Sequence, residues 1–184
     1  MTSVSAPRNS VGAVDPARFR SVLGQFCTGV TVVTASLDGE PVGFACQSFS
    51  ALSLDPPLVV FCPSATSRSW PVISRAGTFC VNVLAGDQAE VSAVFGSRRE
   101  DKFDVVPWSR SPAGAPVLDG VLAWVECTVD AVYPGGDHHI VVGRVEVLEA
   151  PNGGRPPLLF HRGRYTATSD PEPWFGWSQP DDWI

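Results

Sequence analysis

The chain has 184 residues, which is enough for one domain with a sizeable core and too few for two ordinary domains with a linker. Charged residues make up 17% of it and the formal net charge is -6, so there is no basic excess that would favour nucleic acid as a partner. No apolar run approaches the roughly 20 residues that span a bilayer, and the N-terminus lacks a secretory signal pattern, so we expect a cytoplasmic protein.

Glycine and proline are frequent, with 17 of each, which favours short strands joined by turns over long helices. The five cysteines are Cys27, Cys46, Cys62, Cys80 and Cys127. Their odd number, wide separation and mostly apolar surroundings indicate reduced core thiols rather than disulfide partners. No C-x-x-C pair is present to hold a metal.

The first predicted element is an amphipathic helix. Residues 1–14 are small, polar and aperiodic, and we expect a flexible arm there. Asp15 is a typical N-cap and Pro16 suits the first helical position. Apolar residues then recur at helical spacing, namely Phe19, Val22, Leu23 and Phe26.

Three strands should follow. Residues 30–34 are a β-branched stretch, and the dipeptide Asp38-Gly39 favours a tight hairpin turn after it. Residues 42–54 are predicted to be the returning strand. Asp55-Pro56-Pro57 should end that strand, because proline offers no donor to a ladder, and residues 58–62 begin the third.

Two short helices and one strand are predicted in the middle of the chain. Residues 64–75 are rich in hydroxyls and suggest a loop that runs into a short helix across one end of the sheet. Residues 79–84 form the next strand. Asp87 and Glu90 have the spacing of a capping pair for a helix that ends at Gly96.

The C-terminal half predicts three more strands. Residues 121–133 alternate as a half-buried strand should, with Glu126 on the outer face, and residues 134–137 form a turn. Residues 140–148 return, and residues 158–160 form a short last strand. Six or seven antiparallel strands with a few short helices favour a closed or nearly closed barrel, since closure removes unpaired edges.

The dinucleotide-binding, P-loop and serine-hydrolase motifs are absent from the sequence. His138 and His139 would point to opposite faces of a strand, and His161 is distant along the chain. A three-histidine metal site is therefore not expected, and we predict no metal.

Two stretches suggest a ligand site. Residues 43–57 carry small and hydroxylated residues where a strand usually has bulky ones, so something flat could lie against them. Residues 64–69 place hydroxyls and a guanidinium at a predicted helix start, where backbone N–H groups and the helix dipole favour a phosphate. The alternative interpretation of the serine-rich strand is an ordinary exposed edge.

Five segments resemble the short-chain flavin reductase family, whose members have an FMN-binding split β-barrel and supply reduced flavin to two-component monooxygenases. The segments are residues 26–34, 48–57, 81–84, 135–143 and 157–165. Their order and spacing together are more specific than any one motif. The resemblance implies a mostly β, antiparallel, Greek-key-like domain over residues 15–169, followed by an aromatic tail over residues 170–184.

The resemblance also implies a homodimer with each flavin in a groove between barrels. FMN is the expected flavin, with FAD as an alternative, and NADH or NADPH is the hydride donor. A separate oxygenase would receive the reduced flavin. The implied flavin-contacting residues are Ala45, Cys46, Gln47, Ser48, Phe49, Ser50, Ala51, Ser64, Ser67, Arg68, Ser69, Asn82, Phe95, Arg99 and Tyr165.

His138 matches the histidine of the family's Gly-Asp-His motif and is the catalytic residue that the resemblance implies. Hydride transfer to flavin needs no protein nucleophile, so a positioning or electrostatic role is sufficient. The alternative is a surface turn histidine. Arg98, Arg99 and Lys102 could likewise bind a phosphate or be a solvated helix end.

The aromatic tail contains Trp174, Phe175, Trp177 and Trp183, a set dense enough that we expect it to dock on something. It could pack on its own barrel or across the dimer, or form a flap over the site. Two other functions also stay open: a flavoenzyme of the same fold that keeps FMN bound and reduces a quinone, nitro compound or corrinoid, and a non-catalytic flavin-binding module.

Overall fold

A computed structural model describes residues 14–168 of the chain. The predicted aromatic tail and almost all of the predicted N-terminal arm lie outside the described residues. Within residues 14–168, no helix is long and apolar enough to cross a bilayer.

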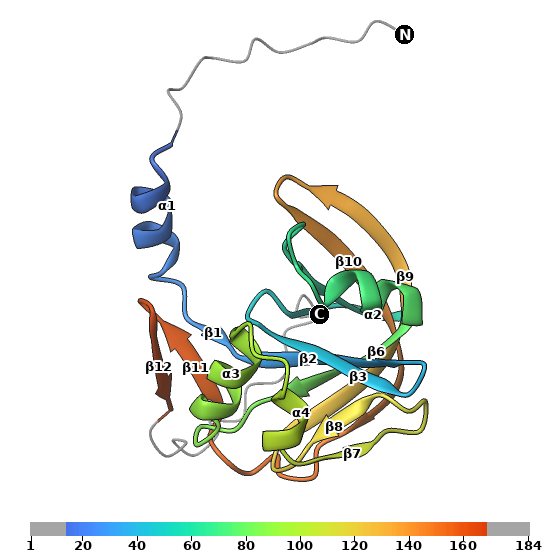
Figure 1. Ribbon diagram of the computed structural model, residues 1–184. Helices are drawn as coiled ribbons and strands as arrows, with labels where there is room; N and C mark the ends of the chain where they lie inside the picture. Colours follow the sequence, from blue (N-terminus) through green and yellow to red (C-terminus); the bar gives the residue numbers. More distant parts are fainter. Residues whose placement is uncertain (1–13, 169–184) are drawn as a thin grey trace, which may run out of the picture.

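A seven-stranded antiparallel sheet forms the body of the molecule, in the order β3-β2-β6-β9-β10-β5-β4 (Figure 1). Its strands are β2 (Thr31–Leu37), β3 (Glu40–Cys46), β4 (Ser50–Leu54), β5 (Pro57–Phe61), β6 (Thr78–Val83), β9 (Ala123–Gly135) and β10 (His138–Glu149). The mostly antiparallel β fold is thus confirmed. Complete closure is not seen, because within residues 14–168 no ladder pairs the edge strands β3 and β4.

The prediction of a single strand over residues 42–54 is wrong. The chain leaves one edge of the sheet at Cys46 and enters the opposite edge at Ser50, so residues 47–49 cross between β3 and β4. The Ser48 hydroxyl fixes this crossing, since it accepts a hydrogen bond from Cys62 N at 2.9 Å and lies 3.2 Å from Cys62 O. A side-chain bond here takes the place of a ladder bond.

Smaller elements surround the sheet. A second sheet contains β1 (Thr28–Gly29), β11 (Leu158–His161) and β12 (Arg164–Ala167), and β7 (Trp108–Arg110) pairs with β8 (Pro116–Leu118). The helices are α1 (Pro16–Leu23), α2 (Trp70–Ala76), α3 (Ala89–Gly96) and α4 (Lys102–Val105). Strands β1, β7, β8 and β12 and helix α4, each of two to four residues, were not predicted.

The turns and helix caps predicted from the sequence are confirmed at two positions and wrong at one. Asp38 and Gly39 both have positive φ, at 55° and 88°, as the tight hairpin between β2 and β3 requires. Asp15 caps α1 by accepting from Arg18 N at 2.9 Å. The predicted capping role of Asp87 is wrong, because Gln88 occupies the N-cap of α3 and the Asp87 carboxylate pairs with Arg155 at 2.5 Å.

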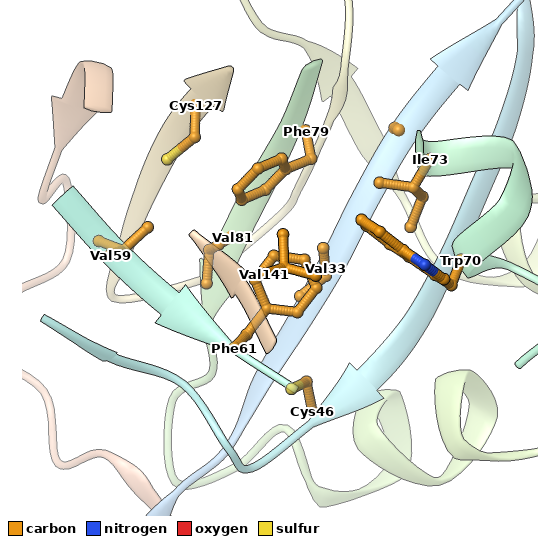
Figure 2. Packing of buried hydrophobic residues seen from close by; sticks show 11 residues of the cluster. Val33, Cys46, Val59, Phe61, Trp70, Ile73, Phe79, Val81, Cys127 and Val141 are labelled. Atoms are coloured by element: carbon orange, nitrogen blue, oxygen red, sulfur yellow. The ribbon is translucent and has the colours of Figure 1, made fainter. Parts of the chain in front are cut away.

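The main core lies inside the curved sheet. Figure 2 shows the rings of Phe61, Trp70 and Phe79 turned toward one another, with centroids 6.0 Å apart for Phe61 and Trp70 and 5.1 Å for Phe61 and Phe79. A Cβ at position 143 would overlap the Phe79 ring, so Gly143 allows this ring to pack against β10.

A second core covers the other face of β2, beneath α3 and the β7–β8 hairpin. Val33 belongs to the first core and Val32 to the second, which is why β2 is buried on both faces. The loop after β7 also covers part of β9. Glu126 is therefore only 2% exposed, contrary to its predicted outward position, and its carboxylate accepts hydrogen bonds from Ser111 Oγ and Ala113 N.

Candidate functional site

A groove of about 840 Å³ opens where the crossing between β3 and β4 meets the loops around α2 and α3. It is lined by residues 44–48, by most of residues 62–69, by the end of α3 with the residues after it, and by His138 at the start of β10. Its size falls within the range of small-molecule sites.

The structure brings most of the predicted site residues together in this groove, although they come from four separate parts of the chain. The predicted residues that line it are Ala45, Cys46, Gln47, Ser48, Ser64, Ser67, Arg68, Ser69, Phe95 and His138.

The hydroxyl-rich loop before α2 is held in place by its own side chains. Ser64 Oγ and Thr66 Oγ1 are hydrogen-bonded at 2.9 Å, and Ser67 Oγ accepts from Trp70 N at 3.1 Å. Ser69 Oγ donates to Gly43 O at 3.2 Å, which ties the loop to β3. These bonds give the wall of the groove a defined shape.

Three cations, Arg68, Arg98 and Lys102, line the groove, and no carboxylate is among its lining residues. Arg68 Nη2 donates to Arg98 O at 2.7 Å, which places the two arginines side by side. A groove lined in this way favours an anionic ligand, because the ligand would relieve the repulsion between like charges.

Lys102 is placed by two backbone acceptors. Its Nζ donates to Phe95 O at 3.1 Å and to Gly43 O at 3.4 Å, and it lies 5.8 Å from the centre of the Phe95 ring. Burial, and secondarily the nearby Arg68, lowers the pKa of this lysine below its usual range. A negative ligand charge would offset both effects.

His138 lies in the groove rather than on an isolated turn. The backbone at the tip of the β9–β10 hairpin is joined to the loop after β5, because Ala65 N donates to Asp137 O and His139 N to Pro63 O, each at 2.9 Å. His138 Nδ1 lies 2.7 Å from Asp137 Oδ1, and this hydrogen bond lowers the pKa of the Asp137 carboxyl. Within residues 14–168, His138 Nε2 makes no hydrogen bond and is open to a ligand.

Asn82, one of the predicted flavin-contacting residues, has a fully buried side chain that lies away from the groove. Its Nδ2 donates to Thr34 Oγ1 at 3.0 Å, and its Oδ1 accepts from Leu118 N at 2.8 Å. The polar side chain on β6 therefore holds the β7–β8 hairpin in place, and its amide nitrogen and oxygen are both hydrogen-bonded within the protein.

Five other predicted residues do not line the groove. They are Phe49, Ser50, Ala51, Arg99 and Tyr165. Phe49 packs against the main core, and Ser50 and Ala51 belong to the edge strand β4. Arg99 is turned away by two hydrogen bonds of 2.6 Å to the Asp101 carboxylate, and the Tyr165 hydroxyl bonds to Ser92 instead.

Several lining residues were missing from the predicted flavin-contacting set. They are Phe44, Cys62, Pro63, Thr66, Gly96, Ser97, Arg98 and Lys102. The basic group after α3 was visible in the sequence, but the one-turn helix α4 that returns Lys102 over Phe95 was not. The groove thus combines small and aromatic surface with cations and hydroxyls, which suits a ligand with a flat ring and a phosphate.

The residues of this groove fit a flavin nucleotide, and comparison with known proteins also points to flavin-binding proteins. The family described as "Flavin reductase like domain" matches residues 23–169. The reductase subunit HsaB of a flavin-dependent monooxygenase from Rhodococcus jostii is 57% identical over 166 residues, which cover 88% of this chain and 85% of that protein.

Two solved structures are also similar. Nitrilotriacetate monooxygenase component B from Mycobacterium thermoresistibile has a TM-score of 0.82 and 53% identity, with 90% of this chain and 93% of that chain covered. The NADH:FAD oxidoreductase SgcE6 from Streptomyces globisporus, in complex with NAD and FAD fragments, has a TM-score of 0.80 and 36% identity, with coverages of 86% and 98%.

Proposed function

This chain belongs to the flavin reductase-like domain family, and from that membership we propose that it reduces FMN with hydride from NADH or NADPH and supplies the reduced flavin to a separate monooxygenase. The observation that carries the proposal is the groove, in which three cations and no carboxylate lie beside small and aromatic surface. FAD is the alternative flavin, and the similarity to an NADH:FAD oxidoreductase supports NADH as the donor.

The cationic side of the groove would hold the flavin phosphate. Arg68 and Arg98 are adjacent, and Lys102 is directed into the same space by Gly43 O and Phe95 O. The hydroxyls of Ser67 and neighbouring residues could donate further hydrogen bonds. Charge-assisted hydrogen bonds of this kind are about twice as strong as neutral ones.

The flavin ring would lie against Ala45 and Gln47, next to the partly buried ring of Phe44. When bound, flavin accepts hydride from nicotinamide, so the protein has to hold two rings in contact and needs no nucleophile. His138 lies beside Ser64 with Nε2 directed to no described residue, which suits a role in positioning the nicotinamide. Asp137 would fix the orientation of the imidazole through Nδ1.

A homodimer is part of the proposal. The β9–β10 hairpin carries Tyr133 and Ile140 opposite each other, both exposed, and β4 exposes Leu54. Exposed apolar side chains that gather on one surface are typical of a protein interface. Because His138 lies at the tip of the same hairpin, such an interface would border the groove. We also propose a cytoplasmic location, which the proposed use of NADH or NADPH supports.

Steady-state oxidation of NADH and NADPH, each with FMN and with FAD, tests the reaction. We expect nicotinamide consumption in proportion to added flavin, and a rate that does not depend on added flavin would favour the flavoenzyme that keeps FMN bound. Flavin binding without nicotinamide consumption would exclude both reductase functions and support a non-catalytic flavin-binding module. Light scattering during size-exclusion chromatography tests the dimer, and a monomeric mass at working concentration would exclude it.

A further inference from the structure

Helix α1 exposes its apolar face. None of its residues is buried, and Phe19, Leu23 and the following Phe26 are all more than half exposed. The helix stands out from the body of the molecule in Figure 1. It is attached mainly through Arg162, whose guanidinium donates to Gln25 Oε1 at 2.6 and 2.8 Å. An amphipathic helix in this position has an apolar face to cover.

Two adjoining hollows lie beside this helix. One, of about 430 Å³, is lined by apolar and aromatic side chains of α1 and β11 together with Arg20, Arg162 and Gln47. The other, of about 520 Å³, shares Arg162 and is lined by His161, Arg164, Tyr165 and Thr166. We call the two hollows with α1 the α1–β12 surface.

The α1–β12 surface is basic although the chain as a whole is acidic. It carries Arg18, Arg20, Arg162 and Arg164, and no carboxylate lines either hollow. Within the described part of the chain, these four arginines form no ion pair. An acidic segment with large aromatic side chains would complement both the charge and the apolar character of this surface.

The segment 169–184 has this composition. It contains Asp170, Glu172, Asp181 and Asp182, no lysine or arginine, and the four aromatic residues named above. We propose that residues 169–184 dock on the α1–β12 surface of their own chain. The aromatic side chains occupy the apolar hollow beside α1, and the carboxylates pair with the arginines around it.

The distances allow this placement. Strand β12 ends at Ala167, and its first residue, Arg164, already lines the hollow. The four residues of β12 span about 10 to 13 Å. The six residue-to-residue steps from Thr168 to Trp174 can span about 20 Å when extended. The segment can therefore return along β12, which is an edge strand of its sheet in the described residues, and reach α1.

The docked segment would border the flavin groove. Gln47 lines both the hollow beside α1 and the groove, so the two spaces share one side chain. This consequence rests on the proposed function, whereas the docking itself does not.

Limited proteolysis with chymotrypsin tests the docking on the full chain. We measure the rate of cleavage at Trp174, Phe175 and Trp177 in the native protein and in Arg20→Glu, with Arg75→Glu as a control on the exposed end of α2. Arg20→Glu should speed this cleavage roughly tenfold, because loss of docking increases the open population, and Arg75→Glu should not.

A charge swap separates docking from damage to α1. Adding Asp170→Arg and Glu172→Arg to Arg20→Glu should restore slow cleavage. Equal rates in the native protein and Arg20→Glu, or no rescue by the swap, would overturn the proposal. Protection that increases with protein concentration would show that the segment binds a second copy, which would overturn docking on its own chain. None of these readouts depends on flavin reduction.

Discussion

Two regions of the molecule gather polar side chains and use them in opposite ways. Beneath the β7–β8 hairpin, Asn82 and Glu126 are buried and their hydrogen bonds are made within the protein. In the groove, Arg68, Lys102 and His138 are held in place through part of their bonding groups and direct the rest into open space.

This difference shows that residue type alone does not identify a ligand site. Asn82 and His138 both lie in segments that resemble the flavin reductase family, yet only His138 lines the groove. What separates them is whether the protein already satisfies the polar group, because a buried group with full hydrogen bonding has nothing to offer a ligand.

The largest expected effect is on stability, at Asn82. Asn82→Leu removes the partners of Leu118 N and Thr34 Oγ1 in the interior, and we expect a loss of about 3 kcal/mol in the free energy of unfolding. For a domain of this size that corresponds to a fall in Tm of roughly 6 to 12 °C. FMN affinity of the folded fraction should not change, and thermal unfolding with FMN titration measures both.

Asn152→Leu is a matched control, because Asn152 is only partly buried and donates one hydrogen bond, to Val121 O. This substitution should lower the free energy of unfolding by about 1 kcal/mol. If Asn82→Leu weakened FMN binding without lowering Tm, the division between the two regions would be wrong.

The next effect is on affinity, at Lys102. Lys102→Ala should weaken FMN binding roughly tenfold to a hundredfold, since a hydrogen bond to a charged group contributes about 1.5 to 3 kcal/mol. The affinity for riboflavin, which lacks the phosphate, should change little in the same variant. Fluorescence titration of both flavins, with Arg75→Ala as the surface control, tests this prediction, and equal losses for both would contradict a phosphate role.

The lowered pKa of Lys102 adds a pH dependence with a defined sign. The charged ammonium binds the phosphate, so FMN affinity should fall as pH rises through a pKa below the usual lysine range. Lys102→Arg keeps its charge and should remove this fall. A pH profile identical in the two proteins would exclude Lys102 as its source.

A smaller effect is expected at His138. His138→Ala should slow nicotinamide-dependent reduction roughly tenfold and leave FMN affinity within about twofold, because the side chain would position the second ring rather than hold the first. Stopped-flow reduction of preformed protein–flavin complex separates the two quantities. Similar losses in rate and affinity would instead make His138 a flavin-binding residue.

The smallest effect is expected at Ser48, whose hydroxyl lines the groove but is also hydrogen-bonded within the protein. Ser48→Ala removes the hydroxyl that bonds to Cys62 N, and we expect about 1 kcal/mol less stability with a modest change in FMN affinity. Urea unfolding and FMN titration measure the pair of effects. An unchanged unfolding midpoint would show that the crossing at residues 47–49 does not need this bond.

The sequence predicted what depends on local chemistry. The helix capped by Asp15, the Asp38-Gly39 hairpin, the strand at residues 30–34 and the long β9–β10 pair all follow from caps, turns and alternation. The resemblance to a family then placed most of the groove. The two stretches predicted from small and hydroxylated residues were 43–57 and 64–69, and residues 44–48 of the first do meet the second in the groove.

What the sequence did not predict depends on contacts between distant segments. The break at residues 47–49 follows from a bond to Cys62, the burial of Glu126 from a hairpin fifteen residues earlier, and the position of Lys102 from carbonyls of Gly43 and Phe95. None of these partners is adjacent in the chain, so no local pattern reports them.

The crossing of residues 47–49 from one sheet edge to the other has an evolutionary consequence. The floor of the groove is formed where the chain passes from one edge strand of the sheet to the other, and Gln47 takes part in no strand ladder. Side chains at this crossing can vary while the surrounding strands keep their register. Single substitutions at these positions can thus change the chemistry of the groove floor during evolution without changing the strand pairing of the sheet.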